Sequence, residues 1–354
     1  MIAYLLIAAA LTSLGYFLLG RVPVCDRSAT TGETPPLSII IPARNEQENL
    51  PRLLKSIHAQ GVDRLEIIVV DDASTDDTAA LAREGNATVL AAPPLAAGWR
   101  GKTWACLHGA RAATHPTLLF LDADAWFEPG GLAAVIRHFS RQPTVLSVLP
   151  YHVVLKPYEN ASAFFQLAMA AGSAAFTFPG FQPAGLFGQM LLVDRNEYFA
   201  IGGHESVKSE ILENFHLARL LRRAGVPLAC AGGKGALSMR MYPGGMRGLI
   251  DGWTKAFAAG AARTPLLMLM LVVAWFAGLV MTAGAPLRYP GWYSSAVYLF
   301  AALQLFILLR RLGSFRFYVA VLYPIPLFVY FLLFARALTR RRVSWKGRTI
   351  DAFL

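Results

Sequence analysis

The sequence predicts an α/β domain with a parallel sheet, flanked by apolar segments long enough to cross a membrane. Two observations lead to this prediction. Between residues 36 and 150, short β-branched runs alternate with segments of helical periodicity, which is typical of strands joined by helical crossovers. Hydrophobic residues make up 55% of the 354 residues and charged residues only 16%, which is too apolar for an ordinary soluble protein.

The strands and helices of the α/β domain are predicted one after another. Residues 38–41 and 66–70 are β-branched runs typical of strands covered on both faces. Residues 46–59 between them have leucines and an isoleucine at helical spacing, with Asn45 as the expected N-cap, and Pro51 favours a late helix start. The same patterns predict strands at 88–91, 117–121 and 145–149 and helices at 76–84, 102–113 and 131–139.

The N-terminal segment 1–22 is expected to be a membrane anchor. Residues 2–20 are apolar and uncharged over just enough length to span a bilayer. A cleaved signal peptide would place a basic residue before its apolar core, whereas Arg21 follows it, so a retained anchor is expected. A linker at about 26–36 then leads into the α/β domain, which we expect to occupy residues 36–250.

The C-terminal segment 251–354 is expected to be a second membrane region with a basic tail. Runs at 265–284, 293–309 and 317–335 have spanning length, and Pro324 with Pro326 interrupts the last, which is therefore kinked or re-entrant. If the α/β domain is cytoplasmic, three full spans would place the arginine-rich tail outside, against the positive-inside rule. The topology of 317–354 stays open at this point.

Charge and cysteine content narrow the functional classes. The net charge of +11 arises partly from arginines that border apolar stretches, which favours contact with anionic lipid over nucleic acid, for which no motif is present. Cys25, Cys106 and Cys230 have neither metal-ligand nor disulfide spacing. The expected location is the cell membrane, crossed more than once, with the α/β domain in the cytoplasm.

Polar residues follow the predicted strands where a nucleotide would bind. The first strand ends at Pro42, Arg44 and Glu46, and the second at Asp72, so these side chains are expected at the carboxyl edge of the sheet. Lys102, in the segment 98–102 that opens a helix, would add an anion-binding corner.

Two neighbouring polar residues have a simpler interpretation. Ser74 is expected to form a turn and Asp76 to cap the next helix.

The pair Asp122 and Asp124 follows the apolar run 117–121 directly. Two carboxylates at the end of a buried strand form an oxygen site for one divalent cation that also leaves positions for a diphosphate. An isolated Asp-x-Asp is more often a turn or a helix cap, but the neighbouring strand ends favour the metal site.

In this order, the motifs resemble the family-two glycosyltransferases of the GT-A fold over about residues 38–255. The resemblance is strongest to the membrane-bound carotenoid- and hopanoid-associated enzymes related to diaponeurosporenoate glycosyltransferase. The segments behind the narrower resemblance are 98–102, 241–245, 252–255 and 345–348.

The resemblance implies inverting transfer of a sugar from a nucleotide-diphosphate sugar, with a UDP-sugar expected, to a membrane lipid. A carotenoid carboxylic acid is the expected acceptor. It also implies roles for individual residues, namely a nucleotide site at Pro42, Arg44, Glu46 and Asp72 with Lys102 nearby, and Mg²⁺ or Mn²⁺ at Asp122 and Asp124. Trp253 and Lys255 come just ahead of the first C-terminal apolar run, where they are expected to contact a headgroup or diphosphate.

One position departs from the family pattern. The family's general base is the Asp of a Glu-Asp pair, and here the pair is Glu213 and Asn214. An amide has no useful basicity, so Asn214 cannot accept a proton. Three alternatives stay open: Glu213 is the base, His216 is the base, or the acceptor is a carboxylate or phosphate anion that needs none.

Three further alternatives are weighed. A polyprenyl-phosphate glycosyltransferase is the nearest enzyme, whereas a processive synthase would show a Gln-x-x-Arg-Trp motif, which is absent from the sequence. A catalytically silent nucleotide-binding scaffold is suggested only by Asn214. The aromatic stretch 164–181 is expected to be core packing or an interfacial element, with a channel for a lipid tail as the alternative.

Overall fold

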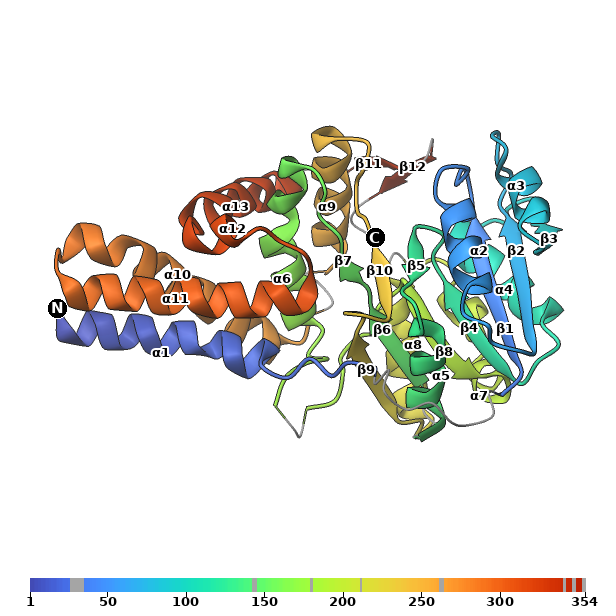
Figure 1. Ribbon diagram of the computed structural model, residues 1–354, viewed down its shortest axis with the longest axis horizontal. Coiled ribbons are helices and arrows are strands. Elements are labelled where there is room, and N and C mark those ends of the chain that lie inside the picture. The colour runs from blue at the N-terminus through green and yellow to red at the C-terminus, as the bar shows by residue number, and fades with distance from the viewer. Residues whose placement is uncertain are drawn as a thin grey trace. The chain divides into compact units, whose positions relative to one another are not determined.

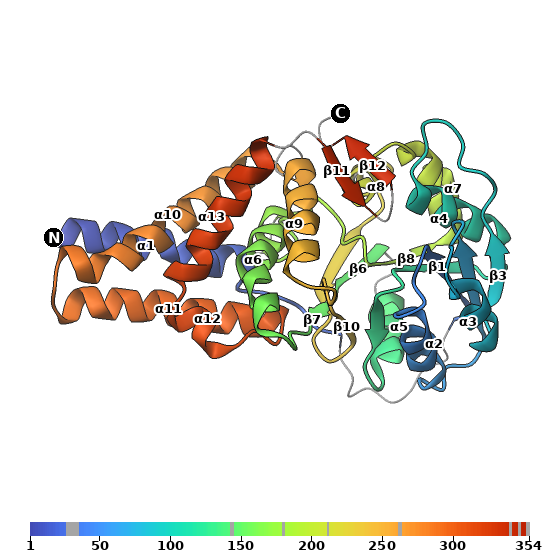
Figure 2. The same ribbon diagram turned by 90° about the horizontal axis from the view of Figure 1, so that it is seen from above.

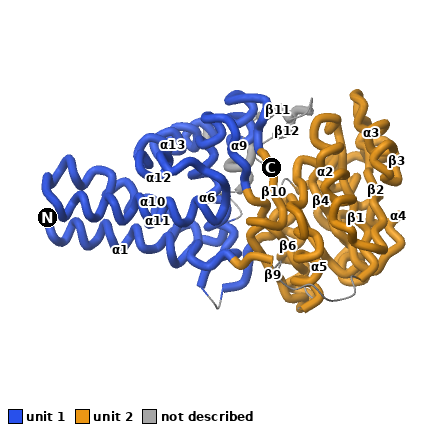
Figure 3. Tube along the Cα trace, in the orientation of Figure 1, with its two compact units in different colours: residues 1–22, 152–184, 241–354 blue, residues 23–151, 185–240 orange. Residues whose placement is uncertain are grey.

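The computed structural model describes residues 1–25, 35–141, 145–178, 181–210, 212–260, 264–339, 342–345 and 348–351, with side chains except at 255–260 and after 337. The predicted linker at 26–36 lies mostly outside these residues. The chain forms two compact units (Figure 3). Unit 1 comprises residues 1–22, 152–184 and 241–354, and unit 2 comprises 23–151 and 185–240. Residues 152–184, expected within the 36–250 domain, thus group with the terminal segments.

Unit 2 is built on a seven-stranded mixed sheet in the order β3-β2-β1-β4-β8-β6-β9 (Figure 1). Strands β1, β2, β3 and β4 run parallel, whereas β8 is antiparallel to both β4 and β6. The strands are β1 (Leu37–Ala43), β2 (Leu65–Asp71), β3 (Thr88–Ala91), β4 (Thr117–Leu121), β6 (Val145–Leu149), β8 (Met190–Asp194) and β9 (Leu228–Gly232).

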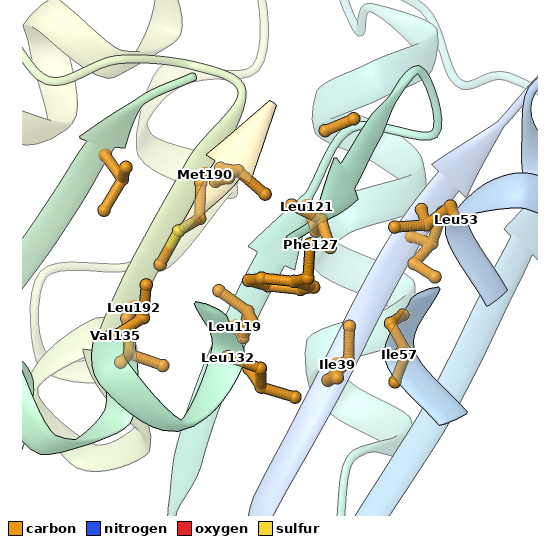
Figure 4. Close-up of a cluster of buried hydrophobic side chains, with 14 of the residues drawn as sticks. Ile39, Leu53, Ile57, Leu119, Leu121, Phe127, Leu132, Val135, Met190 and Leu192 are labelled. Carbon is orange, nitrogen blue, oxygen red and sulfur yellow. The ribbon is translucent and has the colours of Figure 1, made fainter. Parts of the chain in front are cut away.

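The helices of unit 2 pack their apolar faces on this sheet. Figure 4 shows Leu53 and Ile57 of one helix and Leu132 of another packed with Ile39 and Leu119 of the central strands. Burial of these aliphatic side chains is the main stabilising term of the unit. The helices are α2 (Leu50–His58), α3 (Thr78–Glu84), α4 (Gly101–Ala112), α5 (Gly131–Arg141), α7 (Arg195–Ala200) and α8 (Glu213–Arg223), with a short 3₁₀ turn, η2, at Gly203–Val207.

The five predicted strands of unit 2 are confirmed, but two predictions were wrong: the N-cap of α2 and the parallel direction of every strand. Asn45 does not cap α2: the N-cap is Asn49, and Asn45 has a φ of 52° with its side chain accepting a hydrogen bond from the Thr75 N–H. The late start that Pro51 favoured is therefore correct. The sheet is also not all-parallel, because β8 enters it in the opposite direction between β4 and β6.

A second, three-stranded sheet has the order β5-β10-β7, with β5 (Ala125–Phe127), β10 (Leu237–Met239) and β7 (Tyr151–His152). Strands β5 and β10 pair antiparallel, with Met239 opposite Ala125. Strand β5 begins directly after Asp124, so this sheet continues from the predicted metal-binding pair. A two-stranded sheet, β11 (Arg342–Trp345) and β12 (Arg348–Asp351), lies near the C-terminus.

Unit 1 contains three helices long and apolar enough to cross a membrane among the described residues: α1 (Ile2–Leu19), α10 (Leu266–Arg288) and α11 (Trp292–Leu312). Figure 2 shows them running alongside one another. The third C-terminal run breaks into α12 (Phe317–Val321) and α13 (Pro324–Thr339), so the predicted interruption at Pro324 is confirmed. The unit also contains η1 (Pro157–Ser162), α6 (Ala163–Gly172) and α9 (Met246–Gly260).

Polar contacts fix the direction of the three long helices. The Tyr4 hydroxyl donates to the carbonyl of Met281 near the end of α10. At the other end of α1, Arg311 donates to the carbonyls of Leu19 and Gly20, where a cation stabilises a helix C-terminus. The N-terminus of α1 therefore lies with the α10–α11 turn, and its C-terminus lies with the C-terminus of α11.

The aromatic stretch of unit 1 is mostly core. Phe164, Phe165 and Phe176 are buried, while Phe178 and Phe181 are 56% and 41% exposed. Phe165 stacks on Trp253 with ring centroids 4.9 Å apart. Core packing is thus confirmed for the first part of the stretch.

Candidate active site

The carboxyl ends of β1, β2 and β4 lie at one edge of the main sheet. These strands are parallel neighbours, and Ala43 at the end of β1 is opposite Asp71 at the end of β2. Because β8 is antiparallel to β4, with Met190 opposite Leu121, its first residues lie at the same edge. This edge is where open α/β sheets bind ligands.

The loops after β1 and β2 are joined by hydrogen bonds. The Arg44 guanidinium donates to the Asp72 carbonyl at 2.7 Å, and the same Nη1 lies 3.9 Å from the Asp72 carboxylate. The Glu46 N–H donates to Thr78 Oγ1 at 2.8 Å. Pro42 lies within β1, opposite Val70. The structure therefore places Arg44 against Asp72 and joins Glu46 to the start of α3, and their role as a nucleotide site stays a prediction.

Ser74 fits its predicted structural role, whereas the N-cap of α3 is Asp77, one residue after the predicted Asp76. Ser74 Oγ accepts from the Asn45 N–H at 3.0 Å. The Asp76 carboxylate accepts from the N–H of Thr78, the first residue of α3, at 3.1 Å. Partial desolvation of Asp76 opposes its ionisation, but the bonds from Thr78 and Gln47 outweigh it and lower its pKa. Both residues hold the loop in shape.

Lys102 connects three elements at this edge through its ammonium group. Its Nζ lies 2.6 Å from Asp122 Oδ1 after β4 and 3.6 Å from Glu213 Oε1 at the start of α8. It also donates to the Gly188 carbonyl just before β8, at 2.8 Å. An ammonium has three N–H donors, and three acceptors surround this one. We call Lys102, Asp122 and Glu213 the ion-pair cluster.

The charges of the ion-pair cluster support one another. Desolvation favours the neutral form of Lys102, but the nearby carboxylates of Asp122 and Glu213 outweigh it and raise its pKa above the ordinary value. Lys102 is therefore a permanent cation at neutral pH. Because α4 begins at Gly101, the helix start holds Lys102 at this position, as the sequence predicted.

The Glu213–Asn214 pair at the start of α8 is buried, with 7% and 8% exposure. The Asn214 side-chain amide donates to Glu213 Oε1 at 2.9 Å, so the oxygen that faces Lys102 also receives this bond. The Lys102 ammonium and the Asn214 amide therefore both contact the same carboxylate oxygen, which is already engaged by two protein donors. The geometry thus does not favour Glu213 as the general base.

His216, the other candidate base, is also engaged. Its Nε2 lies 3.2 Å from Glu210 Oε2, and its Nδ1 lies 2.9 Å from Arg219 Nη2. Both ring nitrogens therefore contact protein groups on or next to α8.

Asp122 and Asp124 remain predicted metal ligands. Among the residues with described side chains, no group of three or more His, Cys, Asp or Glu side chains is arranged to hold a metal ion. Mg²⁺ and Mn²⁺ in nucleotide sites need only one or two carboxylates, because substrate phosphates and water complete the coordination. Two carboxylates at the end of β4 fit that donor set, although Asp122 pairs with Lys102 in this structure.

Trp253 and Lys255 belong to unit 1. Trp253 is 2% exposed, and its indole N–H donates to Ser162 Oγ at 3.0 Å, so it acts as a packing residue here. The side chain of Lys255 lies outside the described part of the chain. Their contact with a headgroup or diphosphate stays a prediction.

Gly188 was missed by the sequence analysis. A Cβ at this position would lie 2.5 Å from Asn214 Nδ2, so only glycine allows Asn214 to approach this closely. The available signal was a glycine two residues before the apolar run 190–193, at the end of an aromatic and glycine-rich stretch.

The mixed sheet, the strand-end carboxylates and the polar loops define the class of protein, and comparisons with known proteins agree. Residues 38–214 match the family model described as glycosyl transferase family 2. The chain belongs to this family and is a glycosyltransferase.

Two curated relatives have the same name. The chain is 38% identical over 262 residues to the 4,4'-diaponeurosporenoate glycosyltransferase of Staphylococcus haemolyticus (strain JCSC1435), covering 72% of this chain and 70% of that protein. It is 34% identical over 328 residues to the enzyme of that name from Staphylococcus aureus (strain MRSA252), covering 88% and 87%.

A solved structure shows the same fold. The mannosyltransferase PcManGT from Pyrobaculum calidifontis, in complex with GDP-Man and Mn²⁺, has a TM-score of 0.52 and 19% identity, covering 93% of this chain and 99% of that one. The GT-A fold with terminal apolar helices is therefore confirmed.

Proposed function

We propose that this protein transfers a sugar from a nucleotide-diphosphate sugar to the carboxylate of a membrane-embedded lipid acid, of the class that includes carotenoid acids. The names of the curated relatives support a carotenoid acid as acceptor. The observation that carries the proposal is the pairing of Asn214 with Glu213 at the sheet edge. Position 214 thus carries an amide, which cannot accept the proton of a hydroxyl, and a carboxylate nucleophile has no proton to lose.

The reaction is a single displacement at the anomeric carbon. A carboxylate oxygen of the acceptor forms the new bond to this carbon, and the bond to the β-phosphate oxygen of the donor breaks, with inversion of configuration. The electron pair leaves with the nucleotide diphosphate. No proton is transferred in the displacement, so the lack of a basic residue at position 214 does not hinder it.

The chain's own residues would bind and orient the donor. Arg44, Glu46 and Asp72 line the nucleotide loops, and Lys102 fixes Asp122 and the start of α8. Asp122 and Asp124 would hold a Mg²⁺ or Mn²⁺ ion, whose chemistry is to neutralise charge on the leaving diphosphate. The bound Mn²⁺ of the mannosyltransferase with the same fold is consistent with this assignment.

Transfer assays with matched acceptors test the proposal. Full-length protein in detergent is incubated with UDP-sugars, a metal ion and either a long-chain apolar carboxylic acid or the matching alcohol. Product is expected from the acid and not from the alcohol, and Asp124→Ala should abolish it. Asn214→Asp is expected to add activity on the alcohol, because it supplies a base. Transfer by the wild type to the alcohol alone would refute the anionic-acceptor mechanism.

We also propose a membrane topology. One end of the three-helix group carries Arg288 near the α10–α11 turn, whereas the other carries Arg21, Arg310, Arg311 and Arg316. By the positive-inside rule, we expect the arginine-rich end of the three-helix group to face the cytoplasm. Helix α13 has 16 residues, about 24 Å, which is shorter than the roughly 30 Å bilayer core.

If α12 and α13 enter the membrane without crossing it, the basic tail is also cytoplasmic, which removes the conflict noted in the sequence. Fluorescent-protein and alkaline-phosphatase fusions after residue 354 distinguish the two cases. A fusion active only as periplasmic phosphatase would contradict this topology.

A further inference from the structure

A second group of charged side chains in unit 2 has no role in the steps above. Strand β5 leads directly from Asp124, and strand β10 pairs with it. Side chains on these two strands or directly after them, together with one from α2, form what we call the arginine cluster: Arg52, Trp126, Glu128, Ser238 and Arg240. The cluster begins two residues after a predicted metal ligand.

Hydrogen bonds fix the tryptophan of the arginine cluster. The Trp126 indole N–H donates to Glu128 Oε1 at 3.2 Å, and the Ser238 hydroxyl donates to the same oxygen at 2.6 Å. The guanidinium carbon of Arg52 lies 3.2 Å from the centroid of the Trp126 ring. Trp126 is buried and Arg52 is exposed. A guanidinium that stacks on a ring keeps its N–H groups at its edge, where they can bind an oxyanion in plane.

Arg240 brings a second guanidinium to the same place. Met239 is opposite Ala125, so extending the β5–β10 register by one residue places Arg240 opposite Asp124. Burial lowers the pKa of Arg52, attraction to Glu128 opposes this, and repulsion from Arg240 adds to the lowering. Ser238 and Arg240 are two residues apart along the strand, so both lie on the face of the β5–β10 pair where Ser238 contacts Glu128 and faces Trp126.

We infer that Arg240 and Arg52 form a subsite for a substrate oxyanion beside Asp124. The inference rests on the proposed function, which supplies two such groups: the diphosphate of the donor and the carboxylate of the acceptor. Both are planar or multi-oxygen anions that guanidinium groups bind through paired hydrogen bonds. Arg240 and Arg52 would thereby hold a substrate oxyanion next to Asp124.

The test compares Arg240→Gln, Arg240→Lys and Arg52→Gln in the full-length protein. Arg64→Gln is the control, because Arg64 is an exposed arginine just before β2, at the opposite edge of the sheet. Three quantities are measured for each variant: the Kd of UDP with Mn²⁺, the KM of the donor and the KM of the lipid acid. Loss of one charge-assisted contact should raise the affected constant by about tenfold or more.

Each outcome has a distinct meaning. A higher Kd for UDP together with a higher donor KM identifies the diphosphate as the bound oxyanion. A higher acceptor KM alone identifies the carboxylate. Arg240→Lys keeps the positive charge but lacks the paired N–H donors of a guanidinium, so its constants should lie between those of the wild type and Arg240→Gln. This variant also keeps the test decisive if Arg240→Gln fails to fold. If Arg240→Lys and Arg52→Gln keep all three constants within twofold while transfer continues, the subsite is refuted and the proposed function stands. If the wild type neither binds UDP nor transfers sugar, the proposed function itself fails.

Discussion

Replacing Lys102 by Met tests whether the ion-pair cluster holds the site together. The substitution keeps a similar length but removes the cation between Asp122 and Glu213. Asp122 is 27% exposed and Lys102 is 36% exposed, so solvent screening limits that pair to about 1 kcal/mol. The side chain of Glu213 is 10% exposed, and the loss of its ammonium partner should cost about 1–2 kcal/mol. The expected loss of stability is therefore about 2–3 kcal/mol.

The assay separates a positioning role from a nucleotide contact. Thermal unfolding of the detergent-solubilised protein and transfer kinetics are measured for Lys102→Met, Lys102→Arg and the exposed-lysine control Lys55→Met. A positioning role predicts a lower Tm and a lower kcat for Lys102→Met, with partial rescue by Lys102→Arg. If Lys102→Met changes only the donor KM and unfolds at the wild-type temperature, the reasoning from the ion-pair cluster is refuted.

The pH dependence of this contribution has a definite sign. Because the folded-state pKa of Lys102 is raised, its contribution is fully present below the unfolded-state pKa of about 10.4 and is lost only as the pH rises above that value. The stability difference between wild type and Lys102→Met should therefore be constant from pH 7 to pH 9.

Three further predictions follow from other contacts. Gly188→Ala should lower activity and reduce stability by about 1–3 kcal/mol, because its Cβ would lie 2.5 Å from Asn214 Nδ2. Gly248→Ala is the control, because a Cβ there meets no atom within 4 Å. Equal effects of the two substitutions would contradict this packing. Burial, with a smaller effect of Lys102, lowers the pKa of His204 to about 3. Unfolding therefore takes up a proton below about pH 6.5, and stability should fall by at most about 1.4 kcal/mol for each pH unit below that value. His204→Gln should flatten the profile of Tm against pH between about pH 6.5 and 5. Chelation should abolish transfer, and Mn²⁺ or Mg²⁺ should restore it in the wild type but not in Asp124→Ala; activity that survives chelation would exclude the metal-dependent mechanism.

The sequence predicted the part of the fold that depends on local patterns. Strands such as 117–121 and 145–149 were recovered because β-branched and apolar runs mark them directly. Strand β8 was not predicted. Its antiparallel direction also has no local signal, because the sequence of such a strand resembles that of a strand joined by a helical crossover. Asn45 was misassigned because its side chain bonds to Thr75, on the neighbouring loop, which no local rule reveals.

The residue types of the candidate site could be predicted from the sequence, but the contacts between their side chains could not. Asp72, Asp122 and Lys102 stood out because they follow strands or open a helix. Lys102 contacts both Asp122, 20 residues later in the chain, and Glu213, 111 residues later, and sequence spacing does not reveal that the fold brings these three together. Arg240 was also missed, since a single basic residue after a three-residue strand carries no motif.

The direction of β8 has a practical consequence for mutagenesis. Because this strand starts at the ligand edge, it presents the peptide oxygen of Gly188 to Lys102. No side-chain replacement deletes a main-chain oxygen, so an alanine scan would detect two of the three contacts of the ammonium and overlook the third. Ester substitution of the Gly188–Gln189 amide, which weakens that oxygen as an acceptor, would measure it directly.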